Sequence, residues 1–118
     1  MTERITDFFA SWGQADADVR RATLQGCMAE SFTYSDPMTD GPITDLDALT
    51  TYVGKLSEMA PGWSAKALTI DEKDGFARIL VGFGPDPDWQ QHGTYFALER
   101  SGGIETMTGF KGAGELPA

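Results

Sequence analysis

The sequence predicts an α+β domain in which a strongly curved, cone-shaped antiparallel sheet wraps over three helices from the N-terminal half. Three observations support this prediction. The patterns run in the order helix, helix, strand, helix and then four strands. The helices contain too few residues to cover both faces of a sheet, so the sheet has to bend to bury its inner face. Glycines fall within or beside the expected strands, where bending requires bulges or close approach: Gly82, Gly84, Gly93 and Gly109.

Two helices are expected at the start of the chain. The first is predicted by an apolar stripe with the spacing of one helix face, which ends near Gly13. The stripe consists of Ile5, Phe8, Phe9 and Trp12. Asp16 is expected to cap the second helix, in which Val19, Leu24 and Cys27 fall on one side.

A third helix is expected after a stretch rich in turn residues. Thr44, with Asp47 three residues later, resembles a capping box at its start. An apolar face that includes Leu49 and Tyr52 follows, and the helix is expected to stop before Pro61.

Five segments have the alternation or the flanking turns of strands. The first covers residues 32–36 and ends before Pro37, because proline has no N–H to donate to a neighbouring strand. The other four are expected to form a meander over residues 63–71, 76–84, 92–100 and 104–110.

The charge of the chain argues against two classes of partner. Eighteen acidic residues stand against nine lysines and arginines, which gives a formal net charge of −9. Nucleic acids and anionic membranes attract clustered cations, so neither is expected to bind. The charge has no further functional meaning, since an acidic surface commonly keeps a small domain soluble.

One domain is expected over residues 1–111, followed by a loose tail over residues 112–118. Cys27 is the only cysteine, so an internal disulfide and a cysteine-based zinc site are both excluded. We expect no metal and no cofactor. The first residues lack the apolar run of a signal peptide or a membrane span, which favours a cytoplasmic protein.

Two stretches resemble a known family. Residues 32–37 (FTYSDP), then residues 46–49 (LDAL) and Tyr52, are similar to the strand, loop and third helix of SnoaL-like and ketosteroid isomerase-like proteins, which belong to the nuclear transport factor two-like superfamily. Residues 102–107 (GGIETM) resemble the last hairpin of those proteins. The resemblance implies the cystatin-like cone with an apolar pocket at its open end. It implies no single activity, because the superfamily includes isomerases, polyketide cyclases, epoxide hydrolases, dehydratases and transport factors.

Asp36 is the strongest candidate for a catalytic group. The resemblance matches it to the general base of ketosteroid isomerase-like enzymes, which moves a proton next to a carbonyl. A carboxylate at the mouth of an apolar cone would be partly desolvated, and desolvation makes it a better proton carrier near neutral pH. An aspartate before proline can also simply end a strand and cap a loop. Tyr34 is expected on the same strand face, either as a group that orients a ligand or as a core tyrosine.

The resemblance also exposes what this chain lacks. In ketosteroid isomerases a tyrosine and a protonated carboxylic acid stabilise the oxyanion, and the matching residues here are Trp12 and Thr94. Both are weaker hydrogen-bond acids, so a ketosteroid isomerase proper is disfavoured. The arginine-bridged carboxylates of the epoxide hydrolases are also incomplete, since Leu80 stands two residues after Arg78.

The remaining candidates are expected around the rim and walls of the pocket. His92, the only histidine, could shuttle a proton with Asp36 or could simply face water. Trp89 lies in a polar loop, which is typical of a lid or an interface anchor. The expected ligand-binding residues are Trp12, Trp63, Trp89, Thr94 and Met107.

These residues favour a SnoaL-like protein that binds a small apolar molecule, and they leave three hypotheses open, of which a structural dimer with a vestigial cavity is the third. In the first, Asp36 transfers a proton in a cofactor-free isomerase, cyclase or hydrolase. In the second, the chain is a non-catalytic ligand-binding or accessory dimer of the same fold. A homodimer is expected through the outer face of the sheet, where Leu80, Phe96 or Phe110 would supply apolar surface.

Overall fold

The computed structural model describes residues 1–114. The helical elements are α1 (Thr2–Ala10), the 3₁₀ turn η1 (Ser11–Gly13), α2 (Ala17–Cys27) and α3 (Leu46–Met59). The strands are β1 (Met28–Ser35), β2 (Ser64–Lys73), β3 (Phe76–Gly84), β4 (Gln91–Arg100) and β5 (Gly103–Lys111). The predicted order of elements is confirmed. The last four residues of the expected loose tail, 115–118, lie outside the described residues.

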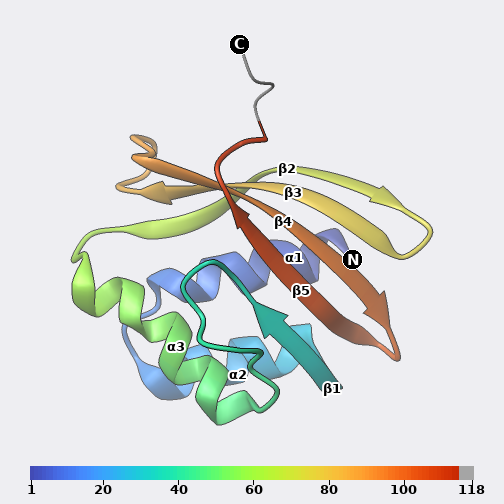
Figure 1. Ribbon diagram of the computed structural model, residues 1–118. Coiled ribbons are helices and arrows are strands. Elements are labelled where there is room, and N and C mark those ends of the chain that lie inside the picture. The colour runs from blue at the N-terminus through green and yellow to red at the C-terminus, as the bar shows by residue number, and fades with distance from the viewer. Residues whose placement is uncertain (115–118) are drawn as a thin grey trace.

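The strands form one open sheet in the order β1-β5-β4-β3-β2. Strands β2 to β5 pair antiparallel as a meander, as predicted. The first strand differs from the antiparallel prediction, because β1 runs parallel to β5. The reason lies in the connection: α3 carries the chain from β1 at one edge to β2 at the other, and parallel neighbours require such a long crossover. Figure 1 shows β1 beside β5, far from β2.

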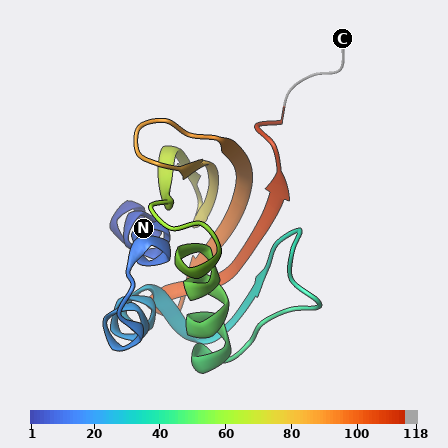
Figure 2. The same ribbon diagram turned by 90° about the vertical axis from the view of Figure 1, so that its left-hand side faces the viewer.

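The sheet curls around the helices, which all lie on its concave side (Figure 2). Two of the strand glycines allow this curvature by close approach. A side chain at Gly93 would meet the Tyr95 ring at 3.0 Å, and one at Gly82 would meet the Trp89 ring at 2.7 Å. The interpretation of these strand glycines as points of close approach is therefore confirmed.

The core fills the space between the concave face and the helices. Its large side chains without solvent exposure include Phe8 and Phe9 from α1, Leu49 and Val53 from α3, and Ile79, Val81 and Met107 from the sheet. None of the helices in the described part of the chain is long and apolar enough to cross a membrane.

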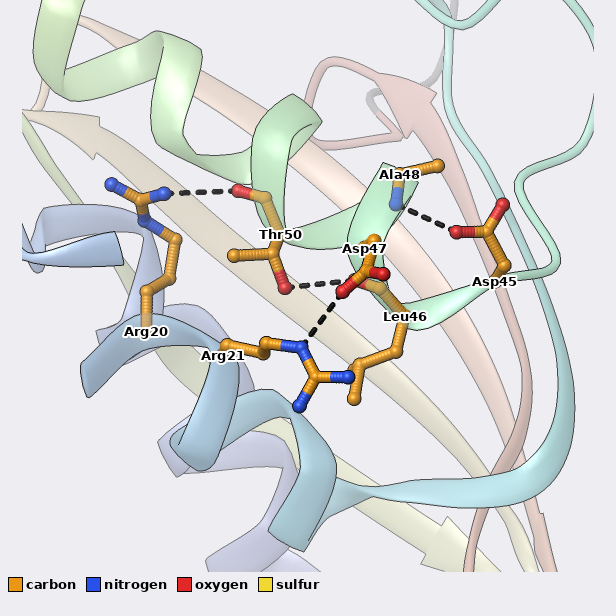
Figure 3. Close-up of polar contacts among 7 residues, drawn as sticks. All are labelled: Arg20, Arg21, Asp45, Leu46, Asp47, Ala48 and Thr50. Atoms are coloured by element: carbon orange, nitrogen blue, oxygen red, sulfur yellow. Dashed lines mark hydrogen bonds and ion pairs between the residues drawn. The ribbon is translucent and has the colours of Figure 1, made fainter. Parts of the chain in front are cut away.

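Aspartates cap two of the helices. Asp16 caps α2 as predicted, accepting hydrogen bonds from the backbone N–H groups of Asp18 and Val19. The cap predicted for α3 was wrong. The capping residue is Asp45, whose carboxylate accepts from the Ala48 N–H at 2.8 Å (Figure 3), because the helix begins one residue later than a cap at Thr44 requires.

A polar seam joins α2 to α3, and two adjacent arginines contribute to it in different ways (Figure 3). The Arg20 guanidinium is buried and donates only to backbone carbonyls, those of Thr50 at 3.0 Å, Gln14 at 3.1 Å and Ala15 at 3.3 Å. Arg21 is exposed and pairs with Asp47 at 2.8 Å. Arg20 therefore ties the segment that follows η1 to the middle of α3.

Candidate functional site

A pocket of about 330 Å³ opens at the end of the sheet where the parallel strands β1 and β5 both finish. Its wall combines η1, the loop after β1, the second half of α3 and the adjoining ends of β3, β4 and β5. The aromatic part of the wall consists of Trp12, Tyr52, Phe83 and Tyr95, and Phe110 borders the pocket from the outer face of the sheet, where its ring packs on Phe96. Asp36 is the one acidic residue of the wall. Asp36 and the aromatic side chains thus line the same pocket at this end of the sheet.

The Asp36 carboxylate lies at the centre of a hydrogen-bond cluster. Its Oδ1 accepts from the Tyr52 hydroxyl at 2.5 Å and from the backbone N–H groups of Met38 and Thr39 at 2.9 and 3.1 Å. Its Oδ2 accepts from the Tyr34 hydroxyl at 2.5 Å. A carboxylate has about four lone-pair positions, two on each oxygen. Oδ1 is therefore fully occupied, whereas Oδ2 keeps room for one further partner.

All the donors to Asp36 among the described residues are neutral, and all except Tyr52 lie within three positions of it in the sequence. Met38 and Thr39 donate because Asp36 folds the following residues into a tight turn, as an aspartate before proline commonly does. The Thr39 hydroxyl closes the same turn on the Asp36 carbonyl at 2.9 Å. The expected cap of the loop by Asp36 is confirmed, and the same carboxylate also lines the pocket, while its catalytic role stays a prediction.

All three tyrosines of the chain belong to this cluster. Burial raises the pKa of Tyr34 well above its ordinary value of 10, and the nearby Tyr95 and Asp36 raise it further. Burial also raises the pKa of Tyr52, with the hydrogen bond to Asp36 as the next cause. The pKa of Tyr95 is raised by burial and to a smaller degree by the Asp36 charge, against a lowering by Tyr34.

The tyrosines should therefore resist ionisation for as long as the fold persists. An acid whose pKa is raised by folding stabilises the folded state below its unfolded pKa, and this stabilisation is lost as the pH rises through the folded value. Stability should fall above about pH 10, the ordinary tyrosine value. We expect absorbance at 295 nm to report no tyrosinate until the circular dichroism signal of folding is lost. Separate tyrosinate formation near pH 10 in the folded protein would show that the cluster is open to water.

Trp12 provides a different kind of group in the wall. Its ring contacts the rings of Tyr52 and Phe83, with centroid distances of 6.1 and 5.8 Å. Its Nε1–H is buried and has no hydrogen-bond acceptor among the described residues. A buried N–H without a partner is costly, so a ligand that brings an acceptor to it would gain binding energy.

Five of the expected ligand-binding or catalytic residues lie elsewhere or deeper, and Thr94 is one of them. Tyr34 has no solvent exposure and reaches the pocket only through Asp36. Met107 is buried beside it in the core, since the two residues are register partners in β1 and β5. Trp63 lies in the turn before β2 and is not among the described wall residues of the pocket. Trp89 packs on Gly82, on the sheet face opposite to Val81, so it acts as cover for the outer face rather than as a lid.

Thr94 was expected in the wall, but Tyr95 takes that place. Side chains alternate between the faces of a strand, and in β4 the inward positions are Gly93, Tyr95 and Ala97. Thr94 therefore points to the other face, where its hydroxyl donates to the Gly112 carbonyl at 2.8 Å. An error of one residue in the register of a strand moves every side chain to the wrong face.

The basic groups of the site lie at the pocket mouth. His92 lines the pocket as predicted and is exposed, with no hydrogen bond to Asp36 among the described contacts. Lys111 lies in the wall, where it is the register partner of Gly93. No group of three or more potential metal ligands occurs among residues 1–114.

A larger hollow of about 720 Å³ lies away from these residues. It follows the point where β1 bulges away from β5, and its wall includes Ala29, Phe32 and Glu105. None of the predicted site residues lines it. Size alone therefore does not favour it over the pocket at Asp36.

No family model matches the sequence, and no curated protein matches it. Solved structures do match its fold. A protein of the SnoaL-like family from Agrobacterium tumefaciens, named provisionally as an isomerase, is 24% identical with a TM-score of 0.80, and the match covers 96% of this chain and 100% of that one. The fold is that of the SnoaL-like proteins. At this identity the likeness shows the fold and no activity.

Two further SnoaL-like or ketosteroid isomerase-like structures agree. A protein from Catenulispora acidiphila with a ketosteroid isomerase-like fold, solved in complex with trimethylamine, is 12% identical with a TM-score of 0.73, over 93% of this chain and 85% of that one. A protein from Jannaschia, named provisionally as a SnoaL-like polyketide cyclase, is 13% identical with a TM-score of 0.70, over 92% and 83%. The predicted α+β cone is thus confirmed.

Proposed function

We propose that this chain binds a small, largely apolar molecule in the pocket beside Asp36 and that Asp36 transfers a proton of that molecule without a cofactor. The observation behind the proposal is the free lone-pair position on Oδ2 of a carboxylate that lines an aromatic pocket. Isomerase and cyclase names among proteins of this fold support the same class of chemistry.

The proton transfer would follow a simple balance. Oδ2 of Asp36 takes the proton from a carbon next to a carbonyl, and the electron pair of the broken C–H bond moves into the carbonyl, whose oxygen becomes negative. The unpartnered Trp12 Nε1–H is the candidate donor to that oxygen. Return of the proton to another carbon completes an isomerisation, and attack by the carbanion on a second carbonyl closes a ring. Neither route needs an oxidant or a reductant.

Proton abstraction can be measured before a physiological substrate is known. We expect the protein to exchange deuterium from D₂O into small cyclic ketones next to the carbonyl, followed by proton NMR. Asp36→Asn should slow this exchange by about 10²- to 10⁴-fold, the usual contribution of a general base. Asp40→Asn, an exposed change in the same loop, should leave the rate unchanged.

A binding protein without catalysis is the second candidate, and one observation favours it. Four hydrogen bonds from the chain itself already hold the Asp36 carboxylate in one place, which suits a fixed polar group that orients a ligand. In this case ketones would bind to the pocket and the exchange rate would be the same in wild type and Asp36→Asn.

We also propose that the chain forms a homodimer through the outer face of the sheet. Phe96 and Phe110 are 46% and 55% exposed there, and their rings pack edge to face at 5.8 Å. Two adjacent exposed phenylalanines are costly to leave in water, and a second copy would cover them. Leu80, the third residue expected on this surface, is half-buried.

Light scattering tests the dimer directly. The wild type should have about twice the chain mass of 12.8 kDa at micromolar concentration, and Phe96→Asp should have the mass of one chain. Val19→Asp, which replaces an exposed apolar residue on α2, serves as the control and should remain dimeric. A wild-type monomer would disprove the proposal.

A further inference from the structure

We infer that the pocket prefers an organic cation whose nitrogen carries alkyl groups, a tertiary or quaternary ammonium, over neutral molecules of the same shape and over primary amines. The inference deepens the proposed function, because it names the ligand class for the pocket at Asp36. It follows from the charge of Asp36, the aromatic wall and the lone pairs that the carboxylate has left.

The charge of the inner pocket is negative and uncompensated. Asp36 makes no ion pair with any of the described residues. Its partners are two hydroxyls and two backbone N–H groups, which hold the carboxylate in place but leave its charge intact. A charge beside apolar walls acts more strongly on a ligand than the same charge in water. The pocket therefore attracts a positive group.

The aromatic rings supply the second attraction. Trp12 stands at 83° to Tyr52 and 64° to Phe83, and Phe83 stands at 50° to Tyr95. Rings that meet at these angles do not form one flat slot. The face of an aromatic ring attracts a cation, most strongly for tryptophan, and the attraction grows when water is excluded. An alkylated ammonium group combines a positive charge with the apolar surface that such walls bind.

The lone pairs of Asp36 decide which cation fits. A primary ammonium has three N–H groups, and burying them requires three acceptors. The Asp36 carboxylate offers only the remaining position on Oδ2, since Oδ1 already accepts three hydrogen bonds. The other N–H groups of a primary ammonium would depend on tyrosine hydroxyls, of which those of Tyr34 and Tyr52 already donate to Asp36. A tertiary ammonium needs one acceptor and a quaternary ammonium needs none. The site therefore discriminates by the number of N–H groups on the ligand.

Two basic residues of the wall oppose a cation, and their position limits their effect. His92 and Lys111 are both exposed at the mouth, where water and salt screen them, while Asp36 is half-buried. Replacing Lys111 tests whether the pocket prefers a cation or an anion. Lys111→Met should strengthen the binding of a cation and would weaken the binding of an anion.

The decisive comparison uses three probes with the wild-type chain: choline, its neutral isostere 3,3-dimethylbutan-1-ol, and ethanolamine. Binding is followed by chemical-shift changes in ¹H–¹⁵N spectra. We expect choline to bind at least about tenfold more tightly than either other probe, with resonances of Trp12 and residues 36–39 among those that move. Added salt should weaken choline binding and leave the neutral isostere unaffected.

Variants then test whether the preference for choline arises in the pocket beside Asp36. Asp36→Asn should reduce choline affinity to about that of the isostere, Lys111→Met should raise it by a few fold, and Asp40→Asn should change nothing. Equal affinity of choline and its isostere would overturn the inference while leaving the proposed ligand pocket intact. Tighter binding of ethanolamine than of choline would overturn the lone-pair argument. If no probe binds but ketones still exchange deuterium, the inference is wrong and the proposed function stands.

Discussion

Replacing Arg20 by methionine is expected to lower the free energy of unfolding by about 3 kcal/mol. Methionine keeps much of the apolar stem but removes all five N–H groups, and the carbonyls of Gln14, Ala15 and Thr50 lose their donor. Each buried acceptor without a partner costs about 1–3 kcal/mol, although the Thr50 carbonyl lies within α3 and keeps its place in the helix. Urea denaturation followed by circular dichroism measures the change.

The neighbouring residue is a matched control. Arg21→Met removes an ion pair between side chains that are 46% and 81% exposed, so the change should stay within about 0.5 kcal/mol. The two variants differ by one position and have the same chemistry. Equal losses for both would contradict the role given to the buried guanidinium. Gly54 lies against that guanidinium, with no space for a side chain. The guanidinium is therefore closely packed on this side.

Replacing Gly103 by alanine is expected to cost about 3 kcal/mol, the upper end for overpacking. A side chain at this position would point into the backbone of β1, against the amide nitrogen of Ala29 and within 2.6 Å of the carbonyl carbon of Met28. Backbone atoms cannot rotate away as a flexible side chain can. The start of the β1–β5 pairing, where Met28 faces Ile104, should therefore separate.

Gly26→Ala should instead raise the free energy of unfolding. Gly26 is exposed in the last turn of α2, and nothing lies within 4 Å of an added Cβ. Alanine favours a helix over glycine by about 0.5–1 kcal/mol, so this variant should be more stable than the wild type. Thermal unfolding of the two variants side by side gives the test. A stabilised Gly103→Ala variant would show that β1 and β5 are farther apart at this point than the structure has them.

Most of the fold could be predicted from the sequence because its signals are local. The spacing from Ile5 to Trp12, the cap at Asp16 and the turns at Gly75 and Gly102 each define an element without reference to the rest of the chain. The parallel pairing of β1 with β5 could not be predicted in this way. It joins residues about 75 positions apart, Met28 with Ile104, and no local pattern encodes the partner of an edge strand.

Contacts of the site between residues close in the sequence could be predicted. Contacts that depend on which face of a strand turns inward could not. Tyr34 lies in β1 and Asp36 directly follows the end of that strand, so the alternation of the strand predicts their contact. Tyr95 was missed because the choice between it and Thr94 depends on which face of β4 turns inward. The alternation of small and aromatic residues at Gly93, Tyr95 and Ala97 was the available signal.

The pairing of the first strand with the last has a consequence for protein synthesis. The pocket needs β1 and the loop at Asp36 from the first third of the chain, and Tyr95 and Lys111 from its end. A ribosome releases these segments in order, and the late ones remain in the exit tunnel while the early ones are already outside. Until β5 emerges, one edge of β1 has no partner and the Asp36 cluster lacks its outer wall. Ligand binding therefore requires that β5 has emerged, and a nascent chain halted before β5 should have the three helices but no site.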